Sequence, residues 1–391
     1  MKPIIAVPAV AALVLRAWRR KSLTPAGLVA AAATAVAHAY HPWNLPFALL
    51  AVFFLAGTRV THVKENVKAT LTLSAKGSSG GEGPRTHVQG EADQVRAQVF
   101  ANSLVASVLS VLHANQLYAR AAALRNPDAA EPNGSMCFSW GGDLFVIGII
   151  ANYAAVTADT FSSELGILSK SEPRLITSLT LRKVPRGTNG GVTLLGLGAG
   201  LLGSLTIVTA SMLFLPMCDE STALVPGGGA PWTADNRRLF MGFMVLWGAL
   251  GSVLDSYLGA IFQRSVKDVR TGKIVEGDGG SRVLVSSETG GSETQADVKA
   301  SLLRGEAGKA TDKASESAVD ESSEWVDKFD PKDKHRKPSF GDEQPSRVVE
   351  SGWNLLDNND VNFLMAVTMS VSGMAVASWF WEVPWQSMLG P

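Results

Sequence analysis

Long runs without charged residues dominate the hydrophobic pattern of the chain. Several of them approach the roughly 20 apolar residues that cross about 30 Å of hydrocarbon. A buried helix of a soluble protein usually carries a charged face, and these runs carry none. The pattern therefore predicts membrane spans. The uncharged runs are residues 24–40, 45–57, 99–112, 144–157, 192–217, 240–254 and 363–380.

The first apolar run, residues 3–15, is short and is followed by four positive charges. A secretory signal carries its positive charges before the apolar stretch rather than after it. We therefore expect a short first span rather than a cleaved or surface-lying segment. Together the runs predict an all-α fold, a polytopic membrane helix bundle of about eight spans. The four charges are Arg16, Arg19, Arg20 and Lys21.

The loops between the runs differ in charge, and this difference predicts the sidedness of the protein. Loops rich in Lys and Arg tend to stay on the cytoplasmic side of a membrane. Threading about eight spans through a bilayer puts every basic loop on one face and leaves both termini on the other. The basic, cytoplasmic loops are residues 16–22, 59–96, 159–191 and 264–360, and the opposite loops are residues 41–44, 116–143 and 218–236.

Composition alone does not define the class, because 46% of the 391 residues are hydrophobic and the formal net charge is zero. A long polar segment, residues 277–346, lowers the average hydrophobicity. We expect it to be disordered, because it cannot bury enough apolar surface to offset its ordering entropy. The expected division is a membrane core at 1–276, a disordered cytoplasmic insert at 277–346, and a strand-like segment with the last span at 347–391.

Short β-branched runs between turn formers lie near the edges of this insert. They predict a small cytoplasmic hairpin. The insert between them is compatible with a tolerated loop and with a regulatory segment. The runs are residues 273–276, 282–286 and 347–350.

Two cysteines, Cys137 and Cys218, fall on the non-cytoplasmic face in the predicted topology. An oxidising compartment permits a disulfide between them. Two unpaired thiols at the membrane edge are an equal alternative, and we assign the cysteines no function.

Glycines at residues 198, 200 and 203 match a dinucleotide-binding fingerprint, but they lie within an apolar run with no strand before it. That context excludes the nucleotide interpretation. Small residues at such spacing let membrane helices approach each other closely. We therefore predict helix packing at two pairs of small residues. The pairs are Gly196 with Gly200 and Ala199 with Gly203.

The polar stretch from Asp159 to Gly191, interpreted as a loop between two spans, carries side chains that suit phosphate chemistry. Acidic groups hold divalent metal ions, while basic groups and glycine backbone hold phosphate. At a bilayer edge this mixture favours a site for phosphorylated ligands. Its main members are Asp159, Glu164, Lys170, Arg174, Arg182, Lys183 and Arg186, followed by Gly190 and Gly191.

Oxygen-bearing side chains also occur in or at the mouth of four predicted spans. Ionisable groups are costly in a membrane and therefore mark functional sites. Such oxygens suit Mg²⁺, which usually binds through one or two carboxylates plus phosphate oxygens. Each residue alone also has a structural explanation, such as a helix–helix hydrogen bond, but a common depth in the cytoplasmic leaflet favours a site. The four residues are Asn102, Asp159, Asp255 and Asp360.

Four segments of the chain resemble the transmembrane protein 19 family of polytopic membrane proteins, and they occur in the same order as in the family. They cover most of the membrane core, and the two segments nearest the N-terminus are long and specific. QVFANS at residues 98–103 is a weaker match. The segments are ADTFSSELGILSKSEPRLIT (158–177), VPRGTNGGVTLLG (184–196), GSVLDSYLGA (251–260) and LDNNDVNFL (356–364).

This resemblance implies an activity, although most of the family has none assigned. Its plant branch includes phytyl-phosphate kinase, which converts a prenyl-type monophosphate to the diphosphate. The chain departs from the family in an Arg–Gln motif split between residues 85–89 and 96–98, and in the long insert before Asp360. By resemblance, Asp159, Glu164, Asp255, Asn359 and Asp360 would serve metal and phosphate, and Arg174, Arg182, Lys183 and Arg186 would anchor phosphate.

We therefore expect a lipid (isoprenoid) monophosphate kinase that uses a nucleoside triphosphate, CTP or ATP, at the cytoplasmic face of an internal membrane such as the endoplasmic reticulum. Its partners would be the lipid phosphate, the nucleotide and the bilayer, with no nucleic acid. The alternative is a transporter or lipid-handling protein without catalytic activity, which polar groups in both leaflets would favour. The expected catalytic residues are Asp159, Glu164 and Asp255, the Mg²⁺ ligands are Asp159, Asp255 and Asp360, and the substrate-binding residues are Asn102, Arg174, Arg182, Lys183, Arg186 and Asn359.

Overall fold

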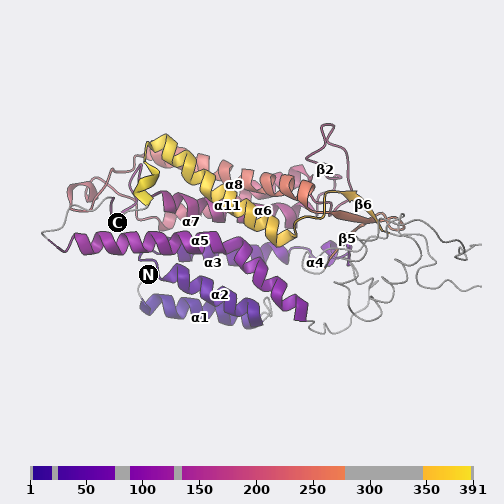
Figure 1. Cartoon of the computed structure of the whole chain (residues 1–391), viewed down its shortest axis with the longest axis horizontal. Helices are drawn as coiled ribbons and strands as arrows, with labels where there is room; N and C mark the ends of the chain where they lie inside the picture. Colours follow the sequence, from indigo (N-terminus) through magenta and orange to yellow (C-terminus); the bar gives the residue numbers. More distant parts are fainter. Residues whose placement is uncertain (1–2, 20–24, 75–88, 127–133, 278–346, 389–391) are drawn as a thin grey trace, which may run out of the picture.

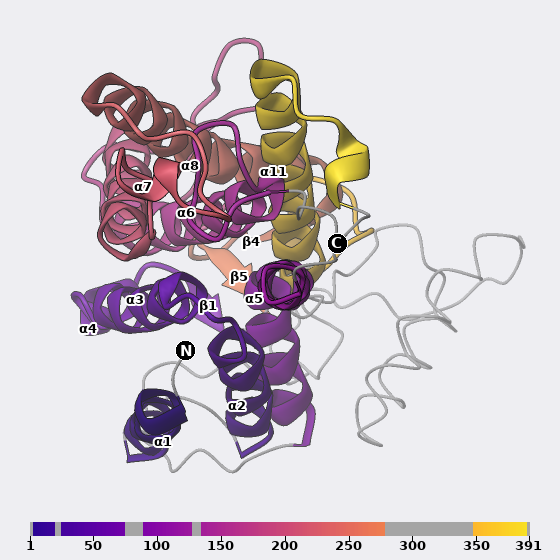
Figure 2. The ribbon, with the colours of Figure 1, turned by 90° about the vertical axis from the view of Figure 1, so that its left-hand side faces the viewer.

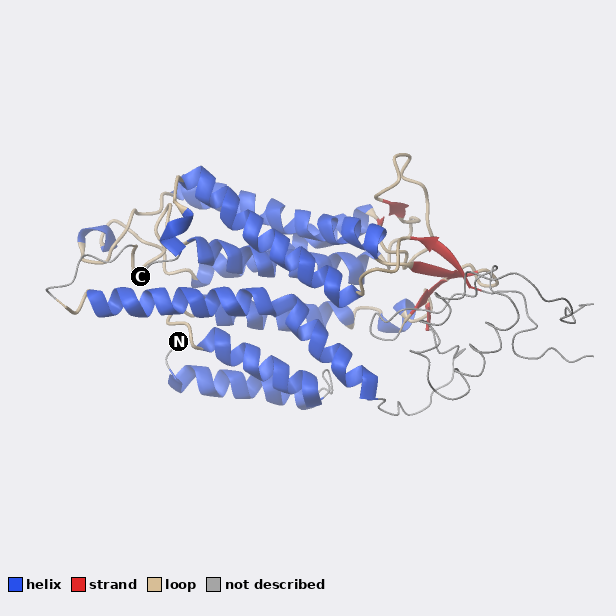
Figure 3. Ribbon diagram, viewed as in Figure 1, coloured by secondary structure: helices blue, strands red, loops and turns tan. Residues whose placement is uncertain are grey.

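The structure of the chain is a computed structural model that describes residues 3–19, 25–74, 89–126, 134–277 and 347–388. The predicted insert and the β-branched run at 282–286 lie outside these residues, apart from residue 277. Within the described part the protein is mostly helical, as predicted, with a small sheet at one end (Figure 1; Figure 3).

Eight helices of fifteen residues or more lie within the described ranges and follow the uncharged runs of the sequence. Four of them, α6, α7, α8 and α11, are long and apolar enough to cross a membrane, and α2 and α3 are shorter apolar helices. The number of membrane crossings stays a prediction. The helices are α1 (Pro3–Arg19), α2 (Pro25–Ala39), α3 (Leu45–Thr61), α5 (Gln89–Ala123), α6 (Leu144–Gly166), α7 (Leu194–Phe214), α8 (Ala234–Phe262) and α11 (Asn358–Trp381).

Leucine side chains cover the outer faces of the long helices. Leu194 and Leu213 at the two ends of α7 are 86% and 76% exposed, and Leu246 in the middle of α8 is 62% exposed. A contiguous apolar surface of this kind is unfavourable in water, whereas hydrocarbon solvates it well. These faces are therefore suited to contact lipid.

Helix α6 forms the centre of the bundle and packs against α3, α5, α7, α8 and α11. Small residues on α7 permit its close approach to α6. A Cβ placed on Gly203 would lie 2.6 Å from the carbonyl oxygen of Thr157, and one on Gly200 would lie 3.3 Å from that of Ala158. The predicted packing role of these glycines is confirmed, and the nucleotide fingerprint is the interior of a helix.

The helices form two groups around α5. Helices α6, α7, α8 and α11 gather on one side of it, while α2 packs on the other side and α1 packs on α2 (Figure 2). The first predicted span is thus a helix at the periphery of the bundle. Its contacts with the rest of the described chain run mainly through α2.

Four short strands form a sheet beyond the ends of the helices, in the order β1–β5–β4–β6 (Figure 3). The predicted hairpin is only partly correct, because β5 pairs antiparallel with β4 rather than with β6. Strand β4 begins only three residues after α8. In the sheet it lies between β5 and β6, which overlap the predicted runs at 273–276 and 347–350. The strands are β1 (Leu73–Ser74), β4 (Ser265–Asp268), β5 (Ile274–Glu276) and β6 (Arg347–Ser351).

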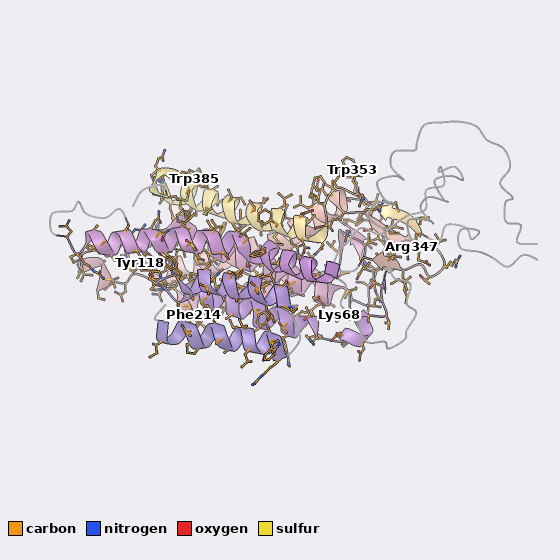
Figure 4. The ribbon with its side chains drawn as sticks, turned by 60° about the horizontal axis from the view of Figure 1, so that its bottom comes forward. Lys68, Tyr118, Phe214, Arg347, Trp353 and Trp385 are labelled. Carbon is orange, nitrogen blue, oxygen red and sulfur yellow. A yellow bond between two sulfur atoms is a disulfide. The ribbon has the colours of Figure 1, made fainter. Side chains whose placement is uncertain are left out.

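The described parts of the predicted basic loops lie at one end of the bundle, which we call the sheet end, and the other loops lie at the opposite end (Figure 1). Lys68, Arg347 and Trp353 mark the sheet end, whereas Tyr118 and Trp385 lie toward the opposite end (Figure 4). The grouping of the loops agrees with the predicted threading. Which end faces the cytoplasm stays a prediction. The short elements are α4 (Glu65–Lys68), β2 (Arg174–Leu175) and β3 (Gly191–Val192) at the sheet end, and η1 (Thr222–Leu224) and η3 (Trp385–Met388) at the other.

Both cysteines lie at the end opposite the sheet and form a disulfide, Cys137–Cys218. The bond joins the segment before α6 to the segment after α7. The sequence left a disulfide and two unpaired thiols as alternatives, and the structure contains the disulfide.

The polar stretch that begins at Asp159 differs in one respect from the sequence interpretation. Its first eight residues are not a loop but the last two turns of α6, which continues to Gly166. Residues without strong helix-breaking character follow Asp159, and Gly166 at the helix end packs closely on Gly196 of α7. Asp159 therefore has the rigid backbone of a helix, which fixes the direction in which its side chain leaves the helix.

Candidate functional site

Two carboxyl groups from different helices meet near the sheet end. Asp159 lies seven residues before the end of α6, and Asp255 lies seven residues before the end of α8. Both helices run toward the sheet end, so the two residues share a depth of roughly 10 Å from the helix ends (Figure 1). Their side chains lie close enough to interact with each other.

A third helix adds an amide to this pair. When the Asn362 side chain is oriented to satisfy its neighbours, its nitrogen donates to Asp255 Oδ1 at 3.0 Å and to the carbonyl oxygen of Asn358 at 3.3 Å. Asn362 is buried in α11. We call Asp159, Asp255 and Asn362 the carboxyl cluster. The sequence analysis did not assign Asn362 a role, although it is an amide between two apolar residues of a span.

Small residues allow the helices to converge at the carboxyl cluster. A Cβ on Gly251 of α8, one turn before Asp255, would lie 2.4 Å from the Cβ of Ala155 on α6. Gly251 thus lets α8 pack directly on α6. Asp159 and Asp255 are brought together by this contact.

Asn102 does not join the cluster. Its backbone carbonyl oxygen accepts a hydrogen bond of 3.0 Å from Asn152 Nδ2. Asn152 precedes Asp159 by seven residues, so this contact lies about two turns deeper in the bundle. The opposite oxygen of Asn152, Oδ1, is buried and has no partner within the described residues.

Glu164 points to another element. Its carboxylate forms an ion pair with Lys68 of α4, and the Lys68 ammonium also donates to the carbonyl oxygens of Val60 and Thr61 at the end of α3. This contact fastens the end of α3 to the end of α6. Glu164 thus connects helices and is not part of the carboxyl cluster.

Asp360 and Asn359 lie at the start of α11. Asp360 accepts a hydrogen bond from the backbone N–H of Asp357 at 3.1 Å, and Asp357 accepts one from the Asp360 N–H at 2.9 Å. This capping box fixes the end of the helix. Asn359 is partly buried and forms no side-chain hydrogen bond to the described residues. Neither side chain contacts Asp159 or Asp255.

The predicted phosphate anchors lie outside the helix ends, on the loop that follows α6. Arg174 donates to the carbonyl oxygen of Leu181 at 3.1 Å, and Arg186 donates to that of Lys170 at 3.3 Å. The other two form ion pairs: Arg182 with Glu350 at 2.7 Å and Lys183 with Glu172 at 2.8 Å. The cations therefore surround the sheet end but do not touch the carboxyl cluster. Arg85 lies outside the described residues, as do the side chains of Gln89, Arg96 and Gln98.

A second group of buried polar side chains occurs at the opposite end, and the sequence analysis did not identify it. The Trp43 N–H donates to His41 Nδ1 at 3.0 Å, His41 Nε2 lies 2.8 Å from His113 Nδ1, and His113 Nε2 lies 3.2 Å from Asp143 Oδ2. Because a backbone N–H can only donate, His41 carries its proton on Nε2 and passes a hydrogen bond to His113. We call this group, completed by Arg120, the histidine cluster.

Asp143 and Arg120 form an ion pair of 2.6 Å that is almost inaccessible to solvent. Burial raises the pKa of Asp143, but His113 and Arg120 lower it more strongly, to about 2. Burial lowers the pKa of His41 to about 2, and the neighbouring His113 acts in the same direction. His41 is therefore neutral in the folded protein. The sequence analysis did not identify the histidine cluster because its residues lie near the ends of separate apolar runs, far apart in the chain.

No group of three or more His, Cys, Asp or Glu able to hold a metal ion occurs in the described part of the chain. The carboxyl cluster offers two carboxylates and an amide.

Apolar helices with unpartnered leucine faces, intramembrane carboxyl groups and cations at one end define a polytopic helical membrane protein with a polar site near one surface. The chain belongs to a known family of this class: "Integral membrane protein DUF92" matches residues 8–370. The comparison names this family and not the transmembrane protein 19 family.

Three relatives are similar to parts of the chain. Protein PGR of Arabidopsis thaliana is 33% identical over 265 residues, which are 67% of this chain and 79% of the relative. The uncharacterized membrane protein MJ0933 of Methanocaldococcus jannaschii is 38% identical over 127 residues, 32% and 42% of the two chains. Protein VTE6 of Arabidopsis thaliana, a chloroplastic protein, is 29% identical over 163 residues, 42% and 39% of the two chains. No solved structure matches.

Proposed function

We propose that the protein is a lipid monophosphate kinase that transfers a phosphoryl group from a nucleoside triphosphate to an isoprenoid monophosphate. The observation that carries the proposal is the meeting of Asp159 and Asp255 at one depth, close to the end of the bundle that bears the cations. The motif resemblance to a family that includes phytyl-phosphate kinase supports the same activity. The lipid tail would lie among the apolar helices, and its phosphate would meet the soluble nucleotide at the membrane surface.

The carboxyl cluster suits Mg²⁺, because this ion usually binds through one or two carboxylates together with substrate phosphates rather than in a complete protein cage. Asp159 and Asp255 would hold it through their carboxylates. When bound, Mg²⁺ would supply charge neutralisation to the donor phosphates. Asn362 would orient Asp255 by donating to Oδ1. Asp360 contributes to the helix cap, so we propose that it does not bind Mg²⁺ directly.

The chemistry asks the protein for position and charge rather than for a nucleophilic side chain. A phosphate oxygen of the lipid forms the new P–O bond to the terminal phosphorus of the donor. The bond from that phosphorus to the bridging oxygen breaks, and the nucleoside diphosphate leaves with the electron pair. Arg174, Arg182, Lys183 and Arg186 would neutralise the phosphates, and Asn102 and Asn359 would contact substrate only after a change of side-chain conformation.

The experiment is an assay of purified full-length protein with Mg²⁺, terminally labelled CTP or ATP, and a panel of prenyl monophosphates. We expect label in a prenyl diphosphate, with one nucleotide preferred. An absence of transfer across the panel would contradict the proposed function.

One observation favours the alternative of a transporter. The histidine cluster places buried ionisable side chains at the end opposite the carboxyl cluster, so polar groups occur toward both ends of the bundle. A pathway protein uses such groups along its length. Flux of a labelled prenyl phosphate across sealed proteoliposomes without nucleotide would support this alternative. Phosphoryl transfer without flux would support the kinase.

The comparisons also bear on the membrane in which the protein resides. Family membership establishes an integral membrane protein. One relative is chloroplastic, and the comparisons give no support to the endoplasmic reticulum. We keep an internal membrane as the proposal.

A further inference from the structure

A cavity of about 570 Å³ opens at the sheet end, outside the carboxyl cluster. Its walls come from the loop that follows α6, the hairpin of β4 and β5, and strand β6. The volume falls within the roughly 300–1,000 Å³ that is typical of small-molecule sites. Because the sheet lies beyond the ends of the helices, the cavity is accessible to a water-soluble ligand (Figure 3).

Cations outnumber carboxylates in the cavity wall. The lining includes Lys183, Arg186, Lys267 and Lys273 against Glu172 and Glu350, a formal surplus of two positive charges. Two of these cations, Lys267 and Lys273, were not assigned a role from the sequence. They lie next to the other two only because the β4–β5 hairpin folds back toward the loop.

The carboxylates do not neutralise the cations equally. Glu172 pairs with Lys183 at 2.8 Å, and Glu350 pairs with Arg182 at 2.7 Å, leaving Lys267 at a longer 3.9 Å from Glu350. Arg182 itself does not line the cavity.

Arg186 and Lys273 form no ion pair with a carboxylate of the described chain. Arg186 donates to the carbonyl oxygen of Lys170 at 3.3 Å, and Lys273 donates to that of Thr70 at 2.6 Å. Guanidinium and ammonium groups have further N–H donors beyond these bonds. Their charge is available to an anion in the cavity.

The backbone holds this wall in place. Gly187 has a φ of +86°, which favours glycine, and a Cβ at this position would lie 2.7 Å from Thr72 Cγ2 and 3.3 Å from Glu276 Oε1. The loop therefore rests directly on the edge of the sheet. The Val184 N–H also donates to the carbonyl oxygen of Pro173 at 3.0 Å. A preorganised wall lowers the entropy cost of binding.

Apolar side chains complete the lining. Leu71, Pro173, Val184 and Pro185 face the same cavity as the cations. A ligand that matches this lining combines several negative charges with a flat or apolar group.

We propose that this cavity binds a soluble nucleoside triphosphate, with the polyphosphate held by Lys183, Arg186, Lys267 and Lys273 and the base against the apolar lining. The inference rests on the proposed function, because it identifies where the donor is held. An anionic lipid headgroup shares the phosphate chemistry, so the test separates the two sources.

The experiment measures binding rather than turnover. The full chain in nanodiscs of zwitterionic lipid is titrated with a fluorescent nucleoside triphosphate, and unlabelled CTP, ATP and inorganic tripolyphosphate are used as competitors. Lys273→Gln is compared with the double variant Lys267→Glu/Lys273→Glu. The control is Arg238→Glu, a charge reversal at an exposed position of the opposite end.

We expect the wild type and Arg238→Glu to bind alike, Lys273→Gln to bind about tenfold more weakly, and the double variant to lose more. The mild Lys273→Gln variant guards against misfolding of the sheet. Unchanged affinity in both lysine variants, or no binding by the wild type, would overturn the inference. Displacement of the nucleotide by vesicles of anionic lipid, but not by tripolyphosphate, would also overturn it.

Failure of this inference differs from failure of the proposed function. Phosphoryl transfer by the lysine variants at the wild-type nucleotide concentration dependence would refute the cavity and leave the kinase in place. Lysine-dependent nucleotide binding without transfer to any prenyl monophosphate would refute the kinase and leave the cavity in place.

Discussion

At the scale of single residues, the carboxyl cluster and the histidine cluster accommodate buried polar side chains in different ways. Buried polar groups are tolerated when they bond to one another, because a group without a partner carries its full desolvation cost. Asp159 and Asp255 bring two carboxyl groups together, a pair that a divalent cation can bind. His41 instead bonds to His113 at 2.8 Å, and His113 lies 3.2 Å from Asp143, which forms an ion pair with Arg120. The first arrangement is suited to exchange a charge, and the second to stay fixed.

His41 of the histidine cluster predicts that the stability of the folded protein depends on pH. Burial lowers the folded pKa of His41 to about 2, whereas the unfolded chain binds a proton near 6.5. Between these values the unfolded state holds one proton more, so stability is complete above about pH 6.5 and falls as the pH drops below it. The expected loss between pH 7 and 5 is about 2 kcal/mol. His113 and Arg120 of α5, Asp143 before α6 and His38 of α2 surround the ring.

Thermal unfolding in detergent between pH 7.5 and 5 measures this effect. His41→Asn keeps an acceptor for the Trp43 N–H and should make the pH profile less steep. His62→Asn, an exposed position at the sheet end, is the control and should keep the wild-type slope. A His41→Asn profile as steep as the wild type would show that another group is responsible.

At the scale of elements, α6 organises the protein because small residues of its neighbours let their backbones approach it. Gly203 and Gly200 of α7 and Gly251 of α8 lie against the backbone or small side chains of α6. Close contact replaces hydrophobic force as the source of helix association in a membrane. The position of Asp159 relative to Asp255 is thus a consequence of glycine packing.

Gly203→Ala should destabilise the protein, although alanine favours the isolated helix. The new Cβ would lie 2.6 Å from the Thr157 carbonyl oxygen, so α7 must move away from α6. Overpacking of this kind costs about 1–3 kcal/mol. The matched control is Gly198→Ala in the same helix, where a Cβ meets nothing within 4 Å. A lower melting temperature for Gly203→Ala alone is expected, and equal effects at both glycines would refute the packing account.

The sequence predicted those elements whose signals are local. Uncharged runs predicted the main helices, and the spacing of small residues predicted the packing of Gly200 and Gly203. Strand β4 was missed because four residues, SVKD, show no alternating pattern long enough to recognise. The end of α6 was placed too early, since polar residues at a membrane surface look alike in a helix and in a loop.

The carboxyl cluster was predicted in part for a related reason. Depth follows from counting residues along a span, so the common depth of Asp159 and Asp255 was accessible. Rotation of one helix against another is not, and it brings Asn362 rather than Asp360 to Asp255. The pairing of Glu164 with Lys68 depends likewise on the tertiary position of α4.

At the scale of the whole molecule, the described loops divide between two ends that differ in chemistry. The sheet end carries the cations, the cavity and the nearby carboxyl cluster, and the opposite end carries the disulfide and the histidine cluster. The charge rule for loops predicts that the sheet end faces the cytoplasm. A kinase that uses soluble nucleotide requires that orientation.

Single cysteines introduced at exposed positions test the orientation. Thr180→Cys lies on the loop at the sheet end, and Glu220→Cys lies at the opposite end; both positions are exposed. In sealed vesicles of known sidedness, an impermeant maleimide should label Thr180→Cys only from the cytoplasmic side and Glu220→Cys only from the other. Labelling of both from one side would contradict the arrangement of the helices. Reversed labelling would contradict the cytoplasmic site.

The central claim is that the pair of carboxyl groups at Asp159 and Asp255 is the centre of phosphoryl transfer, and the initial rate of the Asp255→Asn variant tests it most directly. Asparagine preserves the shape of the side chain and its acceptor for Asn362 while removing the charge. We predict a rate at least about 100-fold below that of the wild type, because a lost charge at the reacting phosphates costs about 2.7 kcal/mol or more. Asp235→Asn, an exposed control on the same helix, should keep the wild-type rate. A folded Asp255→Asn protein that transfers phosphoryl groups as fast as the wild type would contradict the account.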